Sequence, residues 1–519
     1  MRRPPPCSAP ELIIMRVASR CFAQLFLQST AAAVFLHAAA FAAEPHANFY
    51  RSVGSYITGA SNVAPATNAV RSPLEFDSSD QRLNRAFRWA NAQAMAYVFD
   101  DGDPVGPWYE AAEPGREAFC MRDTAHQAMG AQALGLARFN LNMLRHFAAA
   151  VSDSKDWCSY WEINRFDQPA PVDYKNDAEF WYNLPANFDV LACCFRMYVW
   201  TGDQSYLNDP VFLNFYNRTV NDYVGRWGLG IDEVMKRPRL LNVRGIFDPA
   251  RKFPKNRGIP GYNEQDHSYV LGVDVLETQR AAYLAYARIQ QARANADLAL
   301  EFLDKAAAVE HLLTNTWWDA ANHCFYARLD KNYRLEGRGP ENLLWDTVRY
   351  CDHPDAGYQQ LMNAAFGSNS RREYPETSFS WIGNLVNGTM GINLIFTSPL
   401  RSAQKGNWVE VIVQTRPALP ENVKWAELRN LPIRANEVTV RHEGDRKTEF
   451  TNQRGPALIW QAAFAGARDT LLVNGRPMRA MEGEDSSGQP ISWVKVIVGA
   501  GGSASVGEPN QKTGLLRRL

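Results

Sequence analysis

The hydrophobic pattern of this 519-residue chain changes its period near residue 400, and this change limits the folds open to it. Before that point, apolar residues recur at helical spacing, as in "SSDQRLNRAFRWANAQAMAYVF" (78–99) and "SYVLGVDVLETQRAAYLAYARIQ" (268–290). Beyond it, "NEVTVRHEG" (436–444) and "SWVKVIVGA" (492–500) alternate or run β-branched, and "VNGRP" is a turn signal. The sequence therefore predicts a mainly α protein that ends in a small β-domain.

The predicted helices follow one another with loops rich in Asp, Asn, Gly and aromatic residues between them. They include "DTAHQAMGAQALGL", "NLNMLRHFAAAV", "PANFDVLACCFRMYVWTGD", "PENLLWDTVRYC" (340–351), a helix in the 350s and one from Trp381 to Ile395. No fixed-period self-similarity of the kind found in helical solenoids is present. We expect an (α/α)6 toroid of helical hairpins, whose loops converge on one cavity, followed by a β-sandwich.

The N-terminus predicts export. "MRVASRCFAQLFLQSTAAAVFLHAAAFAAEP" (15–45) has a basic start, an apolar stretch and a small-x-small site, which is typical of a signal peptide cleaved near Ala42/Ala43. No later run reaches the roughly 20 apolar residues of a membrane span. The expected organisation is a signal peptide with an upstream extension, a catalytic domain, a β-sandwich and a tail, at 1–43, 44–400, 401–506 and 507–519. The mature protein is expected to be periplasmic or secreted.

Composition narrows the function further. The formal net charge of zero gives no basic surface for nucleic acid. The 15 tryptophans and 20 tyrosines suit either a sugar-binding cleft or a large aromatic core. Cysteine spacing matches no zinc or redox motif, and the adjacent Cys193 and Cys194 in an apolar run favour buried thiols. We expect no cofactor and no metal, and the oligomeric state stays open.

Two acidic segments supply candidates for catalysis. In "GYNEQDHSYV" (261–270), Glu264 and Asp266 precede a predicted helix, and Asp266 could equally cap that helix near Ser268. About 110 residues later, Glu373 and Glu376 stand in a second segment. Glycosidases use one carboxylic acid to protonate the leaving oxygen and one carboxylate to activate water or attack carbon. These four acids are the predicted catalytic set, and which of each pair acts stays open.

Charged and aromatic residues in the loops are candidates for sugar binding. Ion pairing and core packing are the alternative roles for most of them. Arginine binds carboxylates in a bidentate manner, so cations left unpaired among these residues would favour a uronic acid as substrate. The predicted binding residues are Arg122, Asp123, His126, Trp161, Glu162, Arg165, Asp177, Trp181, His267 and Trp381.

Four segments resemble the six-hairpin glycoside hydrolases, in particular the trehalase and processing α-glucosidase group. They are "GREAFCMRDTAHQAMGAQALGL", "NEQDHSYVLGVDVLETQRAAYLAY", "LLTNTWWDAANHCFYARLD" and "REYPETSFSWIGNLVNG". The resemblance implies a sugar-binding acid at Asp123, a general acid in the second segment and a general base in the fourth. Gln265 and Tyr269 depart from the group's acid segment, so its substrate is not carried over. Glycoside hydrolase family 154, associated with β-glucuronidase activity, is a further group that the chain resembles.

These observations together predict an exported, exo-acting glycoside hydrolase that acts on an oligosaccharide or polysaccharide. Inversion of the anomeric carbon is expected because the resembled group inverts. One alternative is a polysaccharide lyase with a Tyr or His base. Another is a non-catalytic glycan-binding protein.

Overall fold

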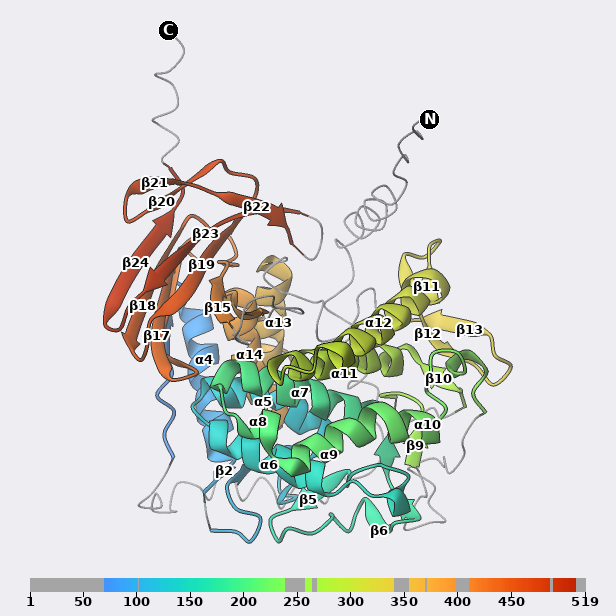
Figure 1. The fold of residues 1–519 in the computed structure, drawn as a ribbon. Coiled ribbons are helices and arrows are strands. Elements are labelled where there is room, and N and C mark those ends of the chain that lie inside the picture. The colour runs from blue at the N-terminus through green and yellow to red at the C-terminus, as the bar shows by residue number, and fades with distance from the viewer. Residues whose placement is uncertain are drawn as a thin grey trace, which may run out of the picture.

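The computed structural model describes residues 70–100, 102–238, 257–263, 268–339, 354–368, 371–397, 410–485 and 489–509. The expected signal peptide and the candidates Glu264, Asp266 and His267 lie outside these residues, as does the helix expected at 340–351. In Figure 1 the helices fill the lower part of the molecule, and a β-sandwich stands at the upper left.

Most helices of the described residues lie between residues 81 and 389. They are α4 Gln81–Ala96, α5 Met121–Ala133, α6 Ala137–Ala149, α7 Pro185–Thr201, α8 Ser205–Asn208, α9 Pro210–Arg218, α10 Val224–Arg226, α11 Val273–Ala292, α12 Ala296–Leu312, α13 Pro354–Phe366 and α14 Pro375–Asn384. Short 3-10 turns are η1 Asp153–Lys155 and η3 Val234–Lys236. Single π-helical turns are η2 Thr219–Tyr223, η4 Leu313–Trp317 and η6 Leu385–Thr389.

Four helices form an inner row: α14 packs against α5, α5 against α7, and α7 against α11. The other helices cover this row, with α6 on α5 and α7, α12 on α11, and α4 and α13 on α14. The row places α14 beside α5 although they are far apart in the sequence, as the closure of a ring of hairpins requires. The expected fold class, mainly α with hairpins of the (α/α)6 type and a C-terminal β-sandwich, is confirmed.

Local sequence explains where most of these helices begin and end. Asp80 caps α4 by accepting from the backbone N–H of Arg82, and Pro185 occupies the first turn of α7, where its missing N–H costs nothing. Gly202 ends α7 with φ of 71°, a left-handed conformation that suits glycine.

Two predicted helix boundaries were wrong. α11 begins at Val273, with Gly272 as its N-cap, instead of near Ser268, so this helix has no need of Asp266 as a cap. The helix expected from Trp381 to Ile395 begins earlier, at Pro375, and Ile392 already belongs to a strand. The apolar run that follows Gly391 fits either structure by its spacing, and pairing with a neighbouring strand decides it.

Short strands lie in the loops between the helices of the helical domain. Their bounds are β2 Val98–Phe99, β3 Trp108–Tyr109, β4 Ala118–Cys120, β5 Glu162–Asn164, β6 Tyr174–Asn176, β7 Glu179–Phe180, β8 Tyr182–Asn183, β9 Arg257–Ile259, β10 Leu271–Gly272, β11 Trp318–Asp319, β12 Cys324–Leu329 and β13 Leu335–Arg338. The pair β4–β5 sets Cys120 opposite Glu162, immediately before α5 begins.

The β-sandwich consists of two sheets. One has the strand order β1-β16-β17-β18-β24-β20-β21 and the other β14-β15-β19-β23-β22. The strands are β1 Glu75–Ser78, β14 Ile392–Thr397, β15 Glu410–Thr415, β16 Trp425–Ile433, β17 Asn436–Glu443, β18 Lys447–Arg454, β19 Leu458–Ala465, β20 Thr470–Val473, β21 Arg476–Arg479, β22 Met481–Glu484, β23 Pro490–Val498 and β24 Gly502–Gly507.

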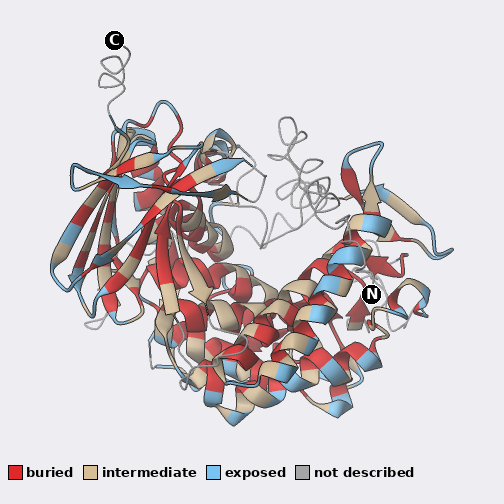
Figure 2. Cartoon of the chain, turned by 45° about the horizontal axis from the view of Figure 1, so that its top comes forward, coloured by how far each residue is buried: buried red, intermediate tan, exposed pale blue. Residues whose placement is uncertain are grey.

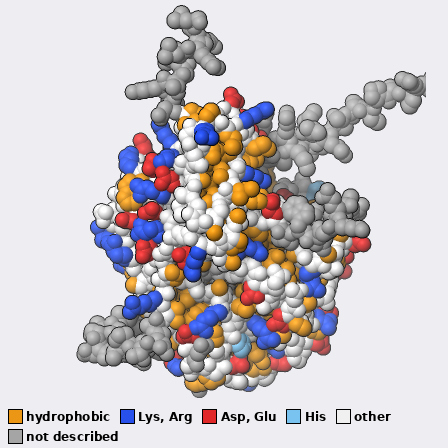
Figure 3. Space-filling view, turned by 60° about the vertical axis from the view of Figure 1, so that its left-hand side comes forward, with side chains coloured by type: hydrophobic (Ala, Val, Ile, Leu, Met, Phe, Trp, Pro, Cys, Tyr) orange, Lys and Arg blue, Asp and Glu red, His pale blue; other side chains and the backbone are white. Residues whose placement is uncertain are grey.

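Side chains facing each other between the two sheets form the sandwich core. The rings of Phe450 and Trp460 stack with centroids 5.2 Å apart, and buried residues follow the inward positions of the strands (Figure 2). The turn between β20 and β21 has φ of 49° at Asn474 and 77° at Gly475, which is the geometry of the predicted Asn-Gly hairpin turn. Hydrophobic side chains gather in a band over the sandwich face of Figure 3.

The sandwich packs against the C-terminal end of α7. The backbone N–H of Arg434 donates to the carbonyl of Trp200, and the ring of Phe396 contacts Phe195 and Tyr198. Strand β1 pairs with β16, so a segment preceding the first described helix is part of the sandwich. Because α7 rises about 1.5 Å per residue, its N-terminal end lies some 20 Å from these contacts.

Cys193 and Cys194 are buried free thiols of α7, which confirms the expectation for this pair. Cys120, Cys158 and Cys324 are also buried in the described part of the chain. Cys351 lies outside it.

Candidate active site

Two inner helices cross at glycines, and this crossing builds the centre of the site. A side chain on Gly130 of α5 would meet the Phe379 carbonyl oxygen of α14 at 1.8 Å, and one on Gly383 would meet the Gly130 nitrogen at 3.3 Å. Positions three and seven residues apart share one face of a helix. The face of α14 that carries Phe379 and Gly383 therefore also carries Glu376, and it meets the face of α5 that carries His126 and Gly130.

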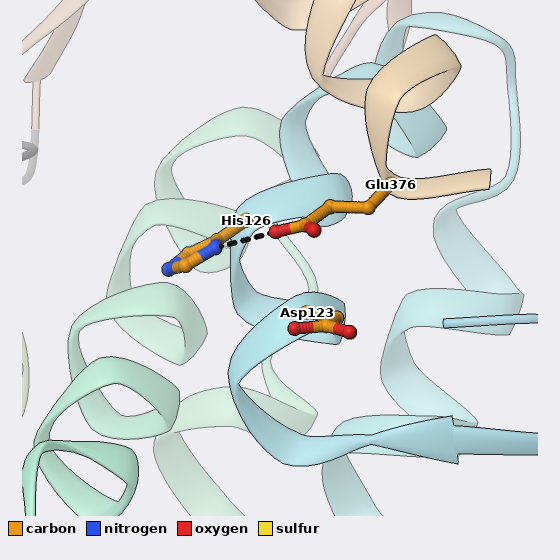
Figure 4. A group of neighbouring side chains, drawn as sticks. All are labelled: Asp123, His126 and Glu376. Carbon is orange, nitrogen blue, oxygen red and sulfur yellow. Dashed lines mark hydrogen bonds and ion pairs between the residues drawn. The ribbon is translucent and has the colours of Figure 1, made fainter. Parts of the chain in front are cut away.

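Asp123, His126 and Glu376 meet above this crossing (Figure 4). The Nδ1 atom of His126 lies 3.0 Å from Oε1 of Glu376, and the ligand-type atoms of all three side chains lie within 4.8 Å of one another. Asp123 is in the first turn of α5 and Glu376 in the first turn of α14, where a helix N-terminus favours negative charge. The structure thus brings together three of the predicted site residues from two distant segments.

The pKa values of His126 and Glu376 are both lowered. Burial lowers the pKa of His126, and its contact with Glu376 only partly offsets the effect. Burial alone would raise the pKa of Glu376, but the hydrogen bond with His126 and the charges of Arg122 and Arg371 outweigh it and lower that pKa. Near neutral pH the pair is therefore a neutral imidazole beside an ionised carboxylate.

Arg122 stands at the centre of the surrounding charges. Its guanidinium carbon lies 5.5 Å from the ring centroid of Trp161 and 5.5 Å from that of Tyr262, and its Nε lies 3.7 Å from Asp123. Aromatic rings hold a guanidinium through cation–π attraction. The charge of Arg122 also acts on carboxyl groups of α7, α11 and α14. The N-terminal ends of all four inner helices therefore converge around one arginine.

Two further carboxyl groups of this region were missed by the sequence analysis. Asp189 of α7 is buried, and both its oxygens accept from the Tyr262 hydroxyl, at 2.7 and 2.8 Å. Asp274 of α11 accepts from the backbone N–H groups of Tyr262 and Val275. Burial raises the pKa of Asp189 to about 7 and that of Asp274 to about 6. Neither residue stands in a motif; a carboxylate among the apolar residues of "NFDVLACC" is the signal that could have flagged Asp189.

A second buried acidic group lies at the β4–β5 pair. Glu162 forms a two-pronged hydrogen bond with Arg116, at 2.9 and 3.0 Å, and Asp173 lies 3.6 Å from the same arginine. Glu110 accepts from the backbone N–H of Glu117, and burial raises the pKa of Glu110 to about 7. Glu162, a predicted binding residue, therefore forms an ion pair with the nearby Arg116.

The remaining predicted residues lie in other contacts. Arg165 pairs with Asp103 and Glu117, and Asp177 accepts from Tyr174 and Ser154. Trp181 is buried, and the buried indole of Trp381 donates to the carbonyl of Leu361 in the helical core.

Glu373 differs from Glu376 in its surroundings. It is exposed, and its backbone carbonyl accepts hydrogen bonds from Gln93 and Tyr97. Of the two acids in this segment, Glu376 is the one that reaches the cluster around Asp123 and His126.

Asp123, His126 and Glu376 offer oxygen and nitrogen donors at a spacing that a metal ion could bridge. A cation there would stand beside the positive charge of Arg122, which already lies 3.7 Å from Asp123. The donors fit a metal in spacing, and Arg122 already offsets part of their negative charge.

Among the helices that the structure describes, none combines the length and apolar character of a membrane span.

Comparisons with known proteins yielded fold neighbours only: no family model and no curated protein matches the chain. An α-L-rhamnosidase from Dictyoglumus thermophilum aligns at a TM-score of 0.48 and 11% identity, over 85% of this chain and 50% of its own. A kojibiose phosphorylase described as putative, from the human microbiome, aligns at 0.45 and 10%, over 88% and 68%. An α-L-rhamnosidase from Aspergillus terreus aligns at 0.46 and 9%, over 83% and 50%. The chain thus spans about half the length of the two rhamnosidases it is similar to.

Proposed function

We propose that this chain is an exported, exo-acting glycoside hydrolase that removes a terminal uronic acid from an oligosaccharide or polysaccharide. The observation that carries the proposal is the convergence of carboxyl groups from four inner helices around Arg122. Glycoside hydrolysis needs one ionised carboxylate and one protonated carboxyl group on opposite sides of the sugar. Acids of both kinds stand here: the pKa of Glu376 is lowered, and that of Asp189 is raised.

Glu376 is proposed as the carboxylate that activates the attacking water. Its neighbour His126 is neutral at pH 7 and holds the carboxylate in place through the 3.0 Å contact. For the proton donor, the sequence predicts Glu264 or Asp266. Support for a role of that segment comes from Tyr262, which directly precedes it and packs edge-on against His126 with ring centroids 6.3 Å apart.

Arg122 is the proposed contact for the carboxylate of a uronic acid. Its guanidinium contacts the rings of Trp161 and Tyr262, and its side chain keeps 20% of its surface exposed. Arginine is suited to such bidentate recognition. Asp123 beside it is the proposed partner for a sugar hydroxyl.

A polysaccharide lyase is the second candidate. A neutral His126 next to Arg122 is the observation that favours it, because a lyase needs a base and a cation that neutralises the uronate carboxylate. Tyr262 is a poorer base: burial and the neighbouring Asp189 carboxylate raise its pKa well above the usual value, and its hydroxyl donates to that carboxylate.

The test is a screen of the purified protein against aryl glycosides and uronic acid oligosaccharides, with Glu376→Gln as the first variant. We expect hydrolysis of a glucuronide or galacturonide and a loss in kcat of about 100-fold or more in the variant. Glu301→Gln, an exposed acid paired with Lys305 on α12, is the control and is expected to match wild type.

The other outcomes separate the candidates. A product with the absorbance of an unsaturated uronate would select the lyase. Binding of glycans without any turnover would select a binding protein. A loss of kcat in Glu373→Gln but not in Glu376→Gln would identify Glu373 as the general base. The anomer released first, read by proton NMR, tests the expected inversion.

A further inference from the structure

Asp189 occupies a position that the sequence did not single out. It lies in the second turn of α7, and its side chain is buried, with 8% exposure. Its hydrogen-bond donor is the Tyr262 hydroxyl, which reaches both carboxylate oxygens. The guanidinium of Arg122 contacts the ring of that same tyrosine. Asp189 is therefore one side chain away from the arginine at the centre of the site.

The contrast with Asp274 shows what is unusual about Asp189. Asp274, in the first turn of α11, receives two backbone N–H groups, from Tyr262 and Val275, and so holds the local backbone in place. Asp189 receives a phenol hydroxyl, a donor that can also serve a protonated carboxyl group. The groups that face Asp189 from its neighbours are Tyr262, Arg122 of α5, Arg196 of its own helix, Asp274, and the more distant Tyr182, Tyr223 and Cys193.

We propose that Asp189, poised by Tyr262, is the acid that protonates the leaving oxygen. The inference rests on the proposed hydrolase function and assigns to a described residue the role that the sequence gives to Glu264 or Asp266. In the step, the Asp189 proton moves to the glycosidic oxygen as the C1–O bond breaks, and the bonding electron pair stays with that oxygen. Water bonds to C1 and passes a proton to Glu376. Solvent then returns a proton to Asp189 and takes one from Glu376.

The protonation state supports this geometry. Burial is the main reason that the pKa of Asp189 is raised to about 7, which makes its protonated form accessible near neutral pH. A catalytic acid works best with a pKa near the working pH. The hydrogen bond from Tyr262 acts in the opposite direction and keeps this pKa from rising further.

Leaving-group dependence tests the role directly. Wild type and Asp189→Asn are compared on aryl glycosides of the sugar found in the screen, one with a 2,4-dinitrophenyl and one with a 4-methoxyphenyl leaving group. An acid is needed only when the leaving oxygen is basic. We expect the variant to lose about 100- to 10,000-fold in kcat/KM on the methoxyphenyl substrate. On the dinitrophenyl substrate we expect less than about a tenfold loss, because that phenolate departs without a proton.

Tyr262→Phe provides a second readout. Removing its hydroxyl removes a hydrogen bond that lowers the pKa of Asp189, so the alkaline limb of the kcat/KM profile should move to higher pH. Asp203→Asn, beyond the far end of α7, is the matched control and should leave both the rates and the profile unchanged.

The outcomes are distinguishable. An equal loss on both substrates, or an alkaline limb that does not move in Tyr262→Phe, would show that Asp189 is structural. A different result would be that Glu264→Gln or Asp266→Asn, instead of Asp189→Asn, loses activity on the methoxyphenyl substrate and keeps it on the dinitrophenyl substrate. That result would assign the proton donor to the segment of Glu264 and Asp266. If wild type cleaves no glycoside at all, it is the hydrolase proposal that fails.

Discussion

The helical domain and the β-sandwich differ in how some of their buried ionisable groups are balanced. In the sandwich, Arg416 and Asp485 face each other as a buried pair at 3.1 Å, and the fully buried His442 is held neutral, its pKa lowered by burial to about 4. In the helical domain, Glu110 next to β3 and Asp189 of α7 are buried carboxyl groups whose pKa values rise to about 7.

We interpret the first set of groups as stabilising the fold, and the raised pKa values of the second set as typical of a site that binds a ligand. The charge of a buried ion pair such as Arg416–Asp485 is balanced within the protein itself. Carboxyl groups with pKa values near 7 are held at a cost in folding free energy, and such groups concentrate at functional sites. This agrees with the proposal that the site lies at the helix ends, while the sandwich contacts the far end of α7.

The largest expected effect comes from Gly130→Ala. The new methyl group would meet the Phe379 carbonyl oxygen at 1.8 Å, a backbone atom that cannot turn aside. We expect the free energy of unfolding to fall by about 3 kcal/mol or more, because α14 must move away from α5. The same shift would separate Glu376 from His126, so activity should also fall.

Gly225→Ala is the control for that variant. A side chain at Gly225 in α10 meets nothing within 4 Å, so this change should be neutral or add about 0.5 kcal/mol of stability. Urea unfolding followed by circular dichroism gives both numbers. Equal stabilities of the two variants would show that α5 and α14 do not cross at these glycines.

A pair of charge-removing variants should change stability in opposite directions. The folded-state pKa of Glu110 is about 7, above the unfolded value of about 4.3, so folding favours its protonated form. Wild type therefore loses this contribution as the pH rises from about 4 to 7. Glu110→Gln should be more stable than wild type above pH 7, by on the order of 2 kcal/mol, and this advantage should vanish toward pH 4.

Asp485→Asn is the counterpart in the sandwich. It removes the negative charge opposite the buried Arg416, so we expect a loss of about 2–3 kcal/mol at pH 7. Thermal unfolding of both variants across pH 4 to 8 is the measurement. If Glu110→Gln is destabilised at pH 8, the contrast between the two regions is incorrect.

The smallest expected effect belongs to two matched tryptophans. Trp381 in the helical core donates to the Leu361 carbonyl, and Trp460 in the sandwich donates to Thr415. Replacement of either by phenylalanine should cost about 1–2 kcal/mol in unfolding free energy, since each leaves an acceptor unsatisfied. KM should stay unchanged in both, and a raised KM in Trp381→Phe alone would restore the substrate-binding role that the sequence suggested.

Several parts of the fold were predictable from local pattern. The period of the apolar residues indicated the helices and most strands of the sandwich, and the Asn474-Gly475 turn was expected from its residue types. Strand β1 was not, because four residues of "EFDS" carry no pattern and acquire their structure by pairing with β16. The start of α11 was misplaced for a similar reason: residues 271–272 pair with β12 before the helix begins.

The candidate site was predictable only in part. Asp123, His126 and Glu376 were named from two segments, but no sequence pattern states that these segments touch. Asp189 was missed because a single acid inside an apolar helix resembles a tolerated polar residue. Trp381 was named for its motif, yet its indole lies in the core.

The sequence alone determined the order of elements, since helix and strand periods and turn residues act over a few neighbours. The tertiary structure decided which helix ends meet, because α5 and α14 approach closely only where glycines remove the side chains between them. It also decided which acids hold a proton, because a pKa depends on burial and on charges brought near by folding. The same residue type thus accepts backbone hydrogen bonds at Asp274 and is a proposed proton donor at Asp189.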